Sequence, residues 1–346
     1  MRLFVLISAG LLGILAFAFI PGGESESSAR VGLVQTPPNN PKELGWVNWK
    51  RDYNAGVNKA KAEGKPLFLL FQEVPGCSTC VGFGESVLAH PLLVEAIENE
   101  FVPVAIHNNK PGSDKATLKK FNEPAWNNPV VRFVDSQGDD LIPREDGVWS
   151  TLKVAERMIS ALKAAKRPVP DYLQWVVEDK PNKQATFSMA CYWSGETCLG
   201  DIRGVTTTRA GWLNGREVVE VDFDENQISH SKLKKIAEER NCGDFVANAK
   251  RARSAKASDQ KYNLRHSRFR YLPLTPSQAT RVNSALGRGQ SPLRWLSPKQ
   301  RELFKQINQA DETTLSGLNR PNSLDGLEAY QWKLKKRLSA KTKHEG

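Results

Sequence analysis

Residues 67–80 read LFLLFQEVPGCSTC and decide the fold of the first half of the chain. The apolar run 67–71 predicts a short buried strand. Cys77 and Cys80 follow as a C-x-x-C pair, where this strand turns into a predicted helix. The partial positive charge at a helix N-terminus favours the thiolate form of a cysteine placed there. The pattern therefore predicts a redox-active dithiol.

Two other uses of such a pair are a stapling disulfide and half of a zinc site. A disulfide that closes so short a loop constrains little of the unfolded chain. No second C-x-x-C and no H-x-x-x-H accompanies the pair, and no two histidines have the spacing of metal ligands. We therefore favour redox chemistry, and we expect neither a metal nor a cofactor.

The residues on either side of the pair predict an α/β domain. Helices are expected at 46–63, 84–100 and 151–165, and strands at 67–71, 101–106 and 129–135. The predicted order is therefore helix, strand, helix, strand, strand, helix.

This order, the place of the C-x-x-C pair and Asn128-Pro129 before the third strand resemble the thioredoxin family over residues 44–166. Residues 74–79 look closest to thioredoxin-like proteins with a V-P-G-(Cys or selenocysteine)-x-T motif. The resemblance implies that Pro129 is cis and faces the dithiol. One departure is Gly76, which stands where ordinary thioredoxins have a tryptophan.

The second half predicts an α+β domain at 183–245, with strands at 185–189 and 218–224 and helices at 193–202 and 229–240. Cys191 lies between the first strand and the first helix, followed by two aromatic residues. Aromatic faces can hold a methyl group while a thiolate attacks an oxidised sulfur beside it.

The oxygen of such a sulfoxide must be protonated, which requires a nearby acid. Glu217, at the start of the second strand, is the candidate. We expect it to be buried beside apolar residues, which favours the neutral carboxyl group.

Residues 190–196, ACYWSGE, resemble the G-C-F-W-G-x-E motif of the peptide-methionine sulfoxide reductase A family. Residues 204–205 and 211–215 resemble its glycine-containing stretches, and residues 217–224 resemble its E-V-V-x-V-x-Y-D strand. The resemblance covers residues 185–240. It implies a second domain built like this family, with activity on methionine sulfoxide in proteins.

The resemblance also assigns roles to residues. It implies that Cys191 is the nucleophile, that Tyr192 and Trp193 form the methyl pocket, and that Glu217 donates the proton. Trp212 stands where the family has a tyrosine that binds the sulfoxide oxygen. The segment between the glycine stretch and the Glu217 strand is shorter than in the family.

Two further cysteines, of the five in the chain, are candidates to resolve an oxidised Cys191. If residues 191–198 form one helix, Cys198 lies about 10 Å from Cys191 along its axis, farther than the roughly 7 Å between Cα atoms that a disulfide allows. Cys242 follows a predicted helix in a loop that we expect to be mobile, so we prefer it. A small buried side chain is the other interpretation of Cys198.

The N-terminal residues 1–20 predict an export signal, with Arg2 before an apolar run at 3–20. Cleavage of this segment and its retention as a membrane anchor both stay open. Either outcome places the protein in an extracytoplasmic compartment such as the periplasm. Such a compartment is oxidising, so free thiols there need an upstream thiol reductant. Residues 21–43 read as a linker.

The C-terminal residues 246–346 read as a basic, partly helical extension. They contribute to the net charge of +11 of this 346-residue chain. A basic surface attracts anionic partners, but no nucleic-acid-binding motif accompanies the charge, so we do not expect nucleic acid as a partner.

The sequence thus predicts an exported protein that reduces methionine sulfoxide in oxidised proteins or peptides, with an attached thioredoxin-like dithiol as electron donor. One alternative is a general thiol–disulfide oxidoreductase whose second domain is a degenerate, non-catalytic binding module. Another is a non-enzymatic protein with a redox-controlled binding surface.

Overall fold

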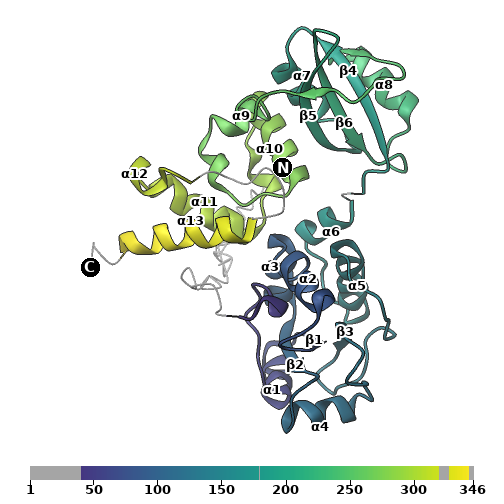
Figure 1. The fold of residues 1–346 in the computed structure, drawn as a ribbon, viewed down its shortest axis with the longest axis vertical. Helices are drawn as coiled ribbons and strands as arrows, with labels where there is room; N and C mark the ends of the chain where they lie inside the picture. Colours follow the sequence, from purple (N-terminus) through teal and green to yellow (C-terminus); the bar gives the residue numbers. More distant parts are fainter. Residues whose placement is uncertain (1–39, 179, 319–326, 343–346) are drawn as a thin grey trace, which may run out of the picture. The chain divides into compact units, whose positions relative to one another are not determined.

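The computed structural model describes residues 40–178, 180–318 and 327–342 (Figure 1). The predicted export signal and nearly all of the predicted linker lie outside these residues. The fold is mixed α/β, with two separate sheets. After a short 3-10 helix, η1 (Lys42–Leu44), the first sheet and its helices begin.

The first sheet has three strands in the order β2-β1-β3. The central strand β1 (Leu67–Gln72) pairs in parallel with β2 (Val102–His107) and antiparallel with β3 (Val130–Val134). All six residues of β1 are buried. The apolar run that predicts this strand therefore lies at the centre of the sheet, as expected for a strand covered on both faces.

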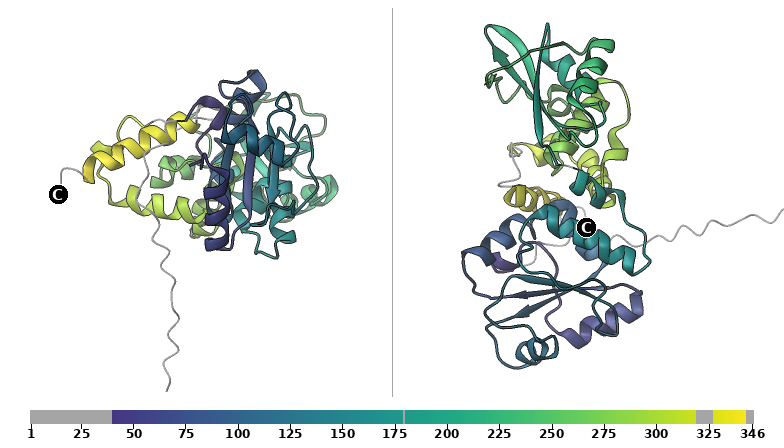
Figure 2. Two further views of the ribbon diagram at one scale, coloured as in Figure 1. Left: turned by 90° about the horizontal axis from the view of Figure 1, so that it is seen from below. Right: turned by 90° about the vertical axis from the view of Figure 1, so that its right-hand side faces the viewer.

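Helices cover both faces of this sheet (Figure 2). Because side chains alternate along a strand, Phe68 and Leu70 of β1 pack with α2 (Ser78–Ser86), α3 (Pro91–Glu100) and α5 (Thr151–Ala164). The other face packs against α1 (Tyr53–Glu63) and α4 (Ser113–Lys120).

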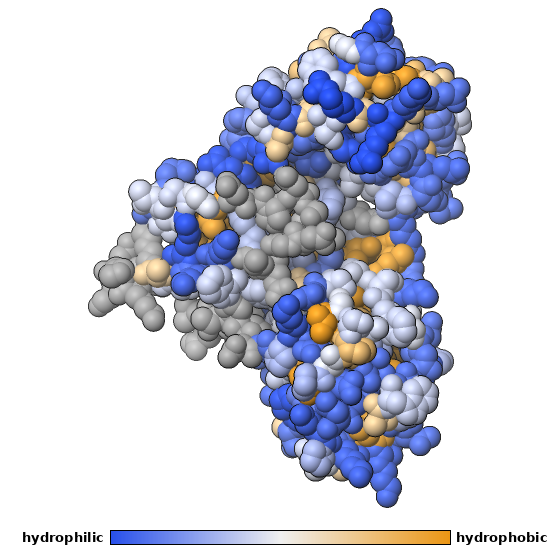
Figure 3. Space-filling model, viewed as in Figure 1, coloured by the Kyte–Doolittle hydropathy of each residue, from blue (hydrophilic) through white to orange (hydrophobic). Residues whose placement is uncertain are grey.

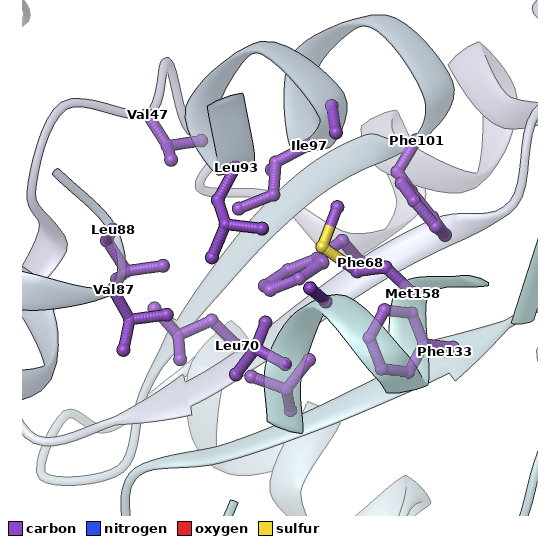
Figure 4. Packing of buried hydrophobic residues seen from close by; sticks show 14 of the residues in the cluster. Val47, Phe68, Leu70, Val87, Leu88, Leu93, Ile97, Phe101, Phe133 and Met158 are labelled. Carbon is purple, nitrogen blue, oxygen red and sulfur yellow. The ribbon is translucent and has the colours of Figure 1, made fainter. Parts of the chain in front are cut away.

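Aromatic side chains fill the first of these two cores (Figure 4). The ring of Phe68 meets those of Phe101 and Phe133 edge-on, with centroids 6.2 and 5.3 Å apart. Complete burial of one such side chain contributes about 1.5–3 kcal/mol. This packing holds β1, and with it the loop that carries the C-x-x-C pair.

The helices of this domain differ from the sequence prediction in three places. The helix expected at 46–63 begins only at Tyr53, because Asp52 caps it by accepting the backbone N–H of Ala55. The helix expected at 84–100 begins earlier, at Ser78, and is interrupted before Pro91. The polar helix α4 was not predicted, because it buries few apolar residues.

The second sheet has five strands in the order β7-β4-β6-β5-β8, and each neighbouring pair is antiparallel. Its strands are β4 (Lys183–Met189), β5 (Val205–Leu213), β6 (Arg216–Phe223), β7 (Asp244–Phe245) and β8 (Arg253–Ser254). The sequence predicts β4 and β6, whereas β5 is missed, because threonine, arginine and glycine interrupt its apolar pattern. β8 extends this sheet beyond residue 245, the expected end of the domain.

Two helices pack on one face of the second sheet, α7 (Tyr192–Leu199) and α8 (His230–Glu239). Val219, Val221 and Phe223 of β6 lie in the core beneath them, so alternate residues of the strand predicted at 218–224 are buried. Ser229 caps α8 by accepting the backbone N–H of Lys232.

The rest of the described chain is mainly helical. It comprises α6 (Asp171–Glu178), which precedes the second sheet, and then α9 (Tyr262–Arg265), η2 (Arg268–Tyr271), α10 (Pro276–Gly287), η3 (Pro292–Trp295), α11 (Pro298–Gln309), α12 (Glu312–Leu315) and α13 (Leu327–Thr342). Both α10 and α11 begin with a proline at the first helical position, and Thr275 and Ser297 before these prolines form capping boxes.

Among the described residues, no single helix has the length and apolar composition of a membrane span. Only α2 and α3 taken together have the required length and apolar composition, and an 86° bend separates the two helices. On the face shown in Figure 3, polar residues cover most of the described surface and apolar residues form separate patches.

Candidate functional site

The C-x-x-C pair lies at the point where β1 leads into α2. Cys77 is the N-cap residue of α2 and is exposed, whereas Cys80 is buried in the first turn. Both are free thiols, and their Sγ atoms are 3.7 Å apart. The exposed thiol can therefore meet a partner, while the buried thiol is close enough to attack a mixed disulfide formed on it.

The two thiols have opposite electrostatic environments. The backbone N–H of Cys80, together with hydrogen bonds from the backbone and side chain of Thr79, lowers the pKa of Cys77 below its ordinary value. Burial, and secondly the nearby Cys77, raises the pKa of Cys80 to about 11. Because the thiolate is the reactive form, these shifts make Cys77 the attacking thiol.

We expect alkylation of the reduced protein by iodoacetamide to separate the two thiols by pH. Because the pKa of Cys77 is lowered from the ordinary thiol value of 9.0, the midpoint of its pH–rate profile should lie below pH 9. Cys80 should react only as the pH approaches about 11. Mass spectrometry at each cysteine measures both rates, and a midpoint for Cys77 at or above pH 9 would contradict the assignment.

The loop before β3 closes over this dithiol. The Asn128–Pro129 peptide bond is cis, as the thioredoxin resemblance implies. The Cys80 thiol donates a hydrogen bond to Oδ1 of Asn128 at 2.6 Å. Pro129, which is buried, therefore lies one residue from a direct contact of the dithiol.

The structure explains the departure at Gly76. A Cβ atom at this position would lie 2.4 Å from the carbonyl oxygen of Glu73 and 2.7 Å from Cβ of Cys80. Its backbone N–H also donates to Oε1 of the buried Glu43 at 2.8 Å. A tryptophan cannot be accommodated in this loop conformation, so the surface next to Cys77 differs from that of ordinary thioredoxins.

The second thiol site lies at the N-terminus of α7. Cys191 is the N-cap residue of this helix and is a free, half-buried thiol. Glu217 of β6 is opposite Met189 of β4, two residues before Cys191. Its Oε2 accepts the backbone N–H of Tyr192 at 2.6 Å, so the carboxyl group lies beside the thiol.

Glu217 differs from expectation in its burial. It lies on the same face of β6 as Val219, beneath α7, but it is partly exposed rather than buried. The reason is its place at the end of the sheet, next to the exposed turn at 214–215. The carboxyl group is therefore accessible to a substrate as well as to the helix.

The three aromatic residues predicted to bind substrate lie together. The ring of Tyr192 meets those of Trp193 and Trp212 edge-on, with centroids 6.0 and 5.8 Å apart. Tyr192 is buried, whereas Trp193 is 36% exposed. The structure thus brings Cys191, Glu217 and these rings into one site.

Two further residues of this site were missed by the sequence analysis. The Tyr192 hydroxyl donates to Oδ2 of Asp259 at 3.2 Å. Tyr262 stacks on Trp193, with centroids 4.1 Å apart and planes inclined by 24°. Burial, and secondly the charge of Asp259, raises the pKa of Tyr192. Both residues lie in a stretch that we interpreted as basic extension, where no pattern indicates a pocket.

The two resolving candidates are bonded to each other. Cys198, in the last turn of α7, forms a disulfide with Cys242, and their Cα atoms are 5.4 Å apart. Cys242 is 2% exposed, so the expectation of a mobile loop is wrong in this state. The cause is β7, which pairs with β4 only two residues later and places Gly243 against Met189.

Among the described residues, no group of three or more His, Cys, Asp or Glu side chains is arranged to hold a metal ion.

Comparison with known proteins identifies the class of the first domain. A family described as thioredoxin-like matches residues 48–136. These residues are therefore a thioredoxin-like domain.

Among solved structures, a DsbH oxidoreductase is 19% identical to the chain, with a TM-score of 0.30. The similarity covers 36% of this chain and 90% of that one. No curated protein matches the chain. Because the family match ends at residue 136, the resemblance of the second domain to peptide-methionine sulfoxide reductase A stays a proposal.

Proposed function

We propose that this chain is a thiol oxidoreductase that reduces methionine sulfoxide in oxidised proteins at Cys191, with the Cys77–Cys80 dithiol as electron donor. The observation that supports this most directly is the place of Glu217, whose carboxyl group accepts the N–H of Tyr192 next to the thiol. A nucleophile, an acid and an aromatic pocket are the three groups that the reaction needs.

In the first step, Cys191 thiolate attacks the sulfoxide sulfur. The S–O bond breaks, the oxygen passes to Cys191, and Glu217 supplies the proton that the oxygen takes up. The products are methionine and a sulfenic acid on Cys191. The rings of Tyr192 and Trp193 hold the substrate methyl group during the attack, and Trp212 forms the third side of the pocket.

In the second step, a resolving thiol displaces water from the sulfenic acid and forms a disulfide with Cys191. We favour Cys242, because Gly243 beside it lies against Met189, two residues before Cys191. Exchange with Cys198 then frees Cys191 and leaves the Cys198–Cys242 disulfide, the pair present in the structure.

In the third step, Cys77 attacks this disulfide and Cys80 completes the exchange, so that the two electrons come from the Cys77–Cys80 dithiol. An upstream thiol reductant must then reduce Cys77–Cys80. A tethered donor raises the effective concentration of the exchange partner. The transfer within one chain and the transfer between two chains both satisfy this chemistry.

We place the protein outside the cytoplasm, exported or attached to the membrane through residues 3–20, on the composition of that segment. Oxidised proteins or peptides are then the substrates.

The second candidate function is general thiol–disulfide exchange, with the second domain as a non-catalytic binding module. The observation that favours it is the Cys198–Cys242 disulfide, which occupies both candidate resolving thiols. A disulfide kept only for stability would leave Cys191 without a resolving partner in its own domain.

The proposed function is tested with the full chain, a peptide that contains methionine sulfoxide, and dithiothreitol as reductant. We expect multiple turnovers of the sulfoxide to methionine. Mass spectrometry of the peptide measures this conversion. A wild-type protein that reduces insulin but never the sulfoxide would establish the second candidate and reject the first.

Glu217→Gln is expected to lower kcat for the sulfoxide about 10²–10⁴-fold, because the amide keeps the acceptor for Tyr192 but cannot supply a proton. Asp222→Asn is the matched control, because Asp222 lies on the opposite face of β6 and binds Thr207 and Gln184. Unchanged kcat in Glu217→Gln would remove Glu217 from the mechanism.

A further inference from the structure

Glu196 is a buried carboxylate whose role the mechanism above does not include. It lies in α7, five residues after Cys191, and is 0% exposed. Its Oε1 accepts the hydroxyl of Thr208 at 3.0 Å, and its Oε2 accepts the backbone N–H of Lys261 at 2.6 Å. Burial of a carboxylate costs free energy unless the group is paired and hydrogen-bonded, as Glu196 is here.

The bond to Lys261 fixes one short stretch of chain, residues 259–262, which we name the pocket segment. The backbone of Lys261 has a φ of 50°, a left-handed conformation that is unfavourable for a residue with a Cβ atom. The hydrogen bond from its N–H to Glu196 holds the chain in this conformation. The Lys261 Nζ also donates to the carbonyl oxygen of Thr208 at 2.7 Å.

The pocket segment has a second anchor, on strand β5. The side chain of Gln260 bonds both backbone groups of Ala210 in β5, because Oε1 accepts the N–H at 3.0 Å and Nε2 donates to the carbonyl at 2.6 Å. The segment is therefore fastened to β5 through Gln260 and to α7 through Glu196.

The two ends of the pocket segment carry the residues that touch the side chains of Tyr192 and Trp193. Asp259 accepts the hydroxyl of Tyr192, and Tyr262 stacks on Trp193. Trp193 is partly exposed, so the packing of Tyr262 restricts the positions that its ring can take. Glu196 thus contacts Lys261, and the residues on either side of Lys261 in the pocket segment contact Tyr192 and Trp193.

We propose that Glu196 is a positioning residue for the Cys191 site: through the backbone N–H of Lys261 it fixes the pocket segment, which in turn sets Tyr192 and Trp193 to bind the substrate methyl group. The proposal rests on the proposed function for its substrate. It assigns Glu196 to substrate binding rather than to bond breaking, because its side chain bonds Thr208 and Lys261 and, among the described residues, neither Cys191 nor Glu217.

The test uses the full chain with Glu196→Ala, Glu196→Gln and a matched control. Asp224→Asn is the control. Asp224 is another buried carboxylate, directly after β6, and it accepts the backbone N–H of Asn226. Two measurements are made on each: hydrogen exchange of the pocket segment, and KM and kcat for a methionine sulfoxide peptide.

We expect Glu196→Ala to accelerate exchange in residues 259–262 and to raise KM about tenfold, with kcat changed less than about threefold. Glu196→Gln should keep the segment protected and keep KM within about twofold, because its amide oxygen still accepts from Lys261. A structural role alone would instead accelerate exchange across the whole sheet and would not be rescued by glutamine.

If Glu196→Ala does not fold, Gln260→Ala decides the matter, because it releases the same segment from β5 at a less buried position. A folded variant with a mobile pocket segment and wild-type KM overturns the proposal, and so does an unchanged pocket segment in both alanine variants.

Failure of the proposed function is distinguishable from failure of this inference. If the wild-type protein reduces no sulfoxide, the proposed function fails. The positioning role is then decided by hydrogen exchange together with the rate at which a bulky maleimide alkylates Cys191. That rate should increase when the pocket segment is released, and an unchanged rate rejects the role.

Discussion

Cys191→Ser is expected to abolish the reduction of methionine sulfoxide, with a loss of at least about 10³-fold in kcat/KM, because serine offers no thiolate to attack the sulfur. The change is small in volume at a half-buried position, so the fold should persist. The measurement is turnover of a methionine sulfoxide peptide with dithiothreitol in excess.

The control for this variant is its own first domain. Insulin reduction by Cys77 and Cys80 should stay at the wild-type rate in Cys191→Ser, because the dithiol is intact. If the variant still reduces the sulfoxide, Cys191 is not the nucleophile. If both proteins reduce insulin equally and neither reduces the sulfoxide, the second domain is a binding module.

The thioredoxin-like domain was predictable because its signals are local. The apolar run of β1 is buried on both faces, and the C-x-x-C pair follows it directly, so short windows of sequence are enough to place both. The cis bond before Pro129 was predictable only through the resemblance to a family. The lowered pKa of Cys77 agrees with its predicted place at a helix N-terminus. The raised pKa of Cys80 could not be predicted, because it depends on the burial of that thiol.

The second site was predictable in part. Strand alternation places Glu217 on the core face of β6, and the strand-to-helix transition places Cys191 at the start of α7. The contact between them depends on the register of β4 against β6, which pairs Met189 with Glu217. Register follows from the packing of whole strands and is not contained in either segment alone.

The contacts of the pocket segment and the pairing of the disulfide could not be predicted from the sequence, because both depend on how distant segments pack. Asp259 and Tyr262 act at a site centred near residue 192, and the hydrogen bonds that hold them come from α7 and β5. No periodicity links such distant residues. The pairing of Cys198 with Cys242 likewise depends on where α8 ends relative to α7.

Cys77→Ser should abolish both insulin reduction and electron donation by the first domain, while the reaction at Cys191 stays intact. Cys77 is the exposed thiol with the lowered pKa, so insulin reduction should fall at least about 10³-fold. Turnover of the sulfoxide with excess dithiothreitol should continue, because that reagent can reach the second domain directly.

The decisive measurement uses fully reduced protein without an external reductant. Each disulfide formed accounts for two electrons and hence for one sulfoxide reduced. Cys77→Ser should therefore yield about one methionine fewer per chain than the wild type, because the Cys77–Cys80 dithiol can no longer be oxidised to a disulfide. Equal yields would show that the two domains do not exchange electrons, whatever each does alone.

Cys80→Ser is the matched variant for this experiment, and it identifies the route. Cys77 can still attack a disulfide, but the buried thiol that releases the mixed disulfide is missing, so the covalent intermediate should accumulate. Mass spectrometry of the cross-linked peptides then shows which cysteine is bound to Cys77. Cys198 or Cys242 as the partner establishes transfer through their disulfide, whereas Cys191 as the partner assigns that disulfide to stability alone.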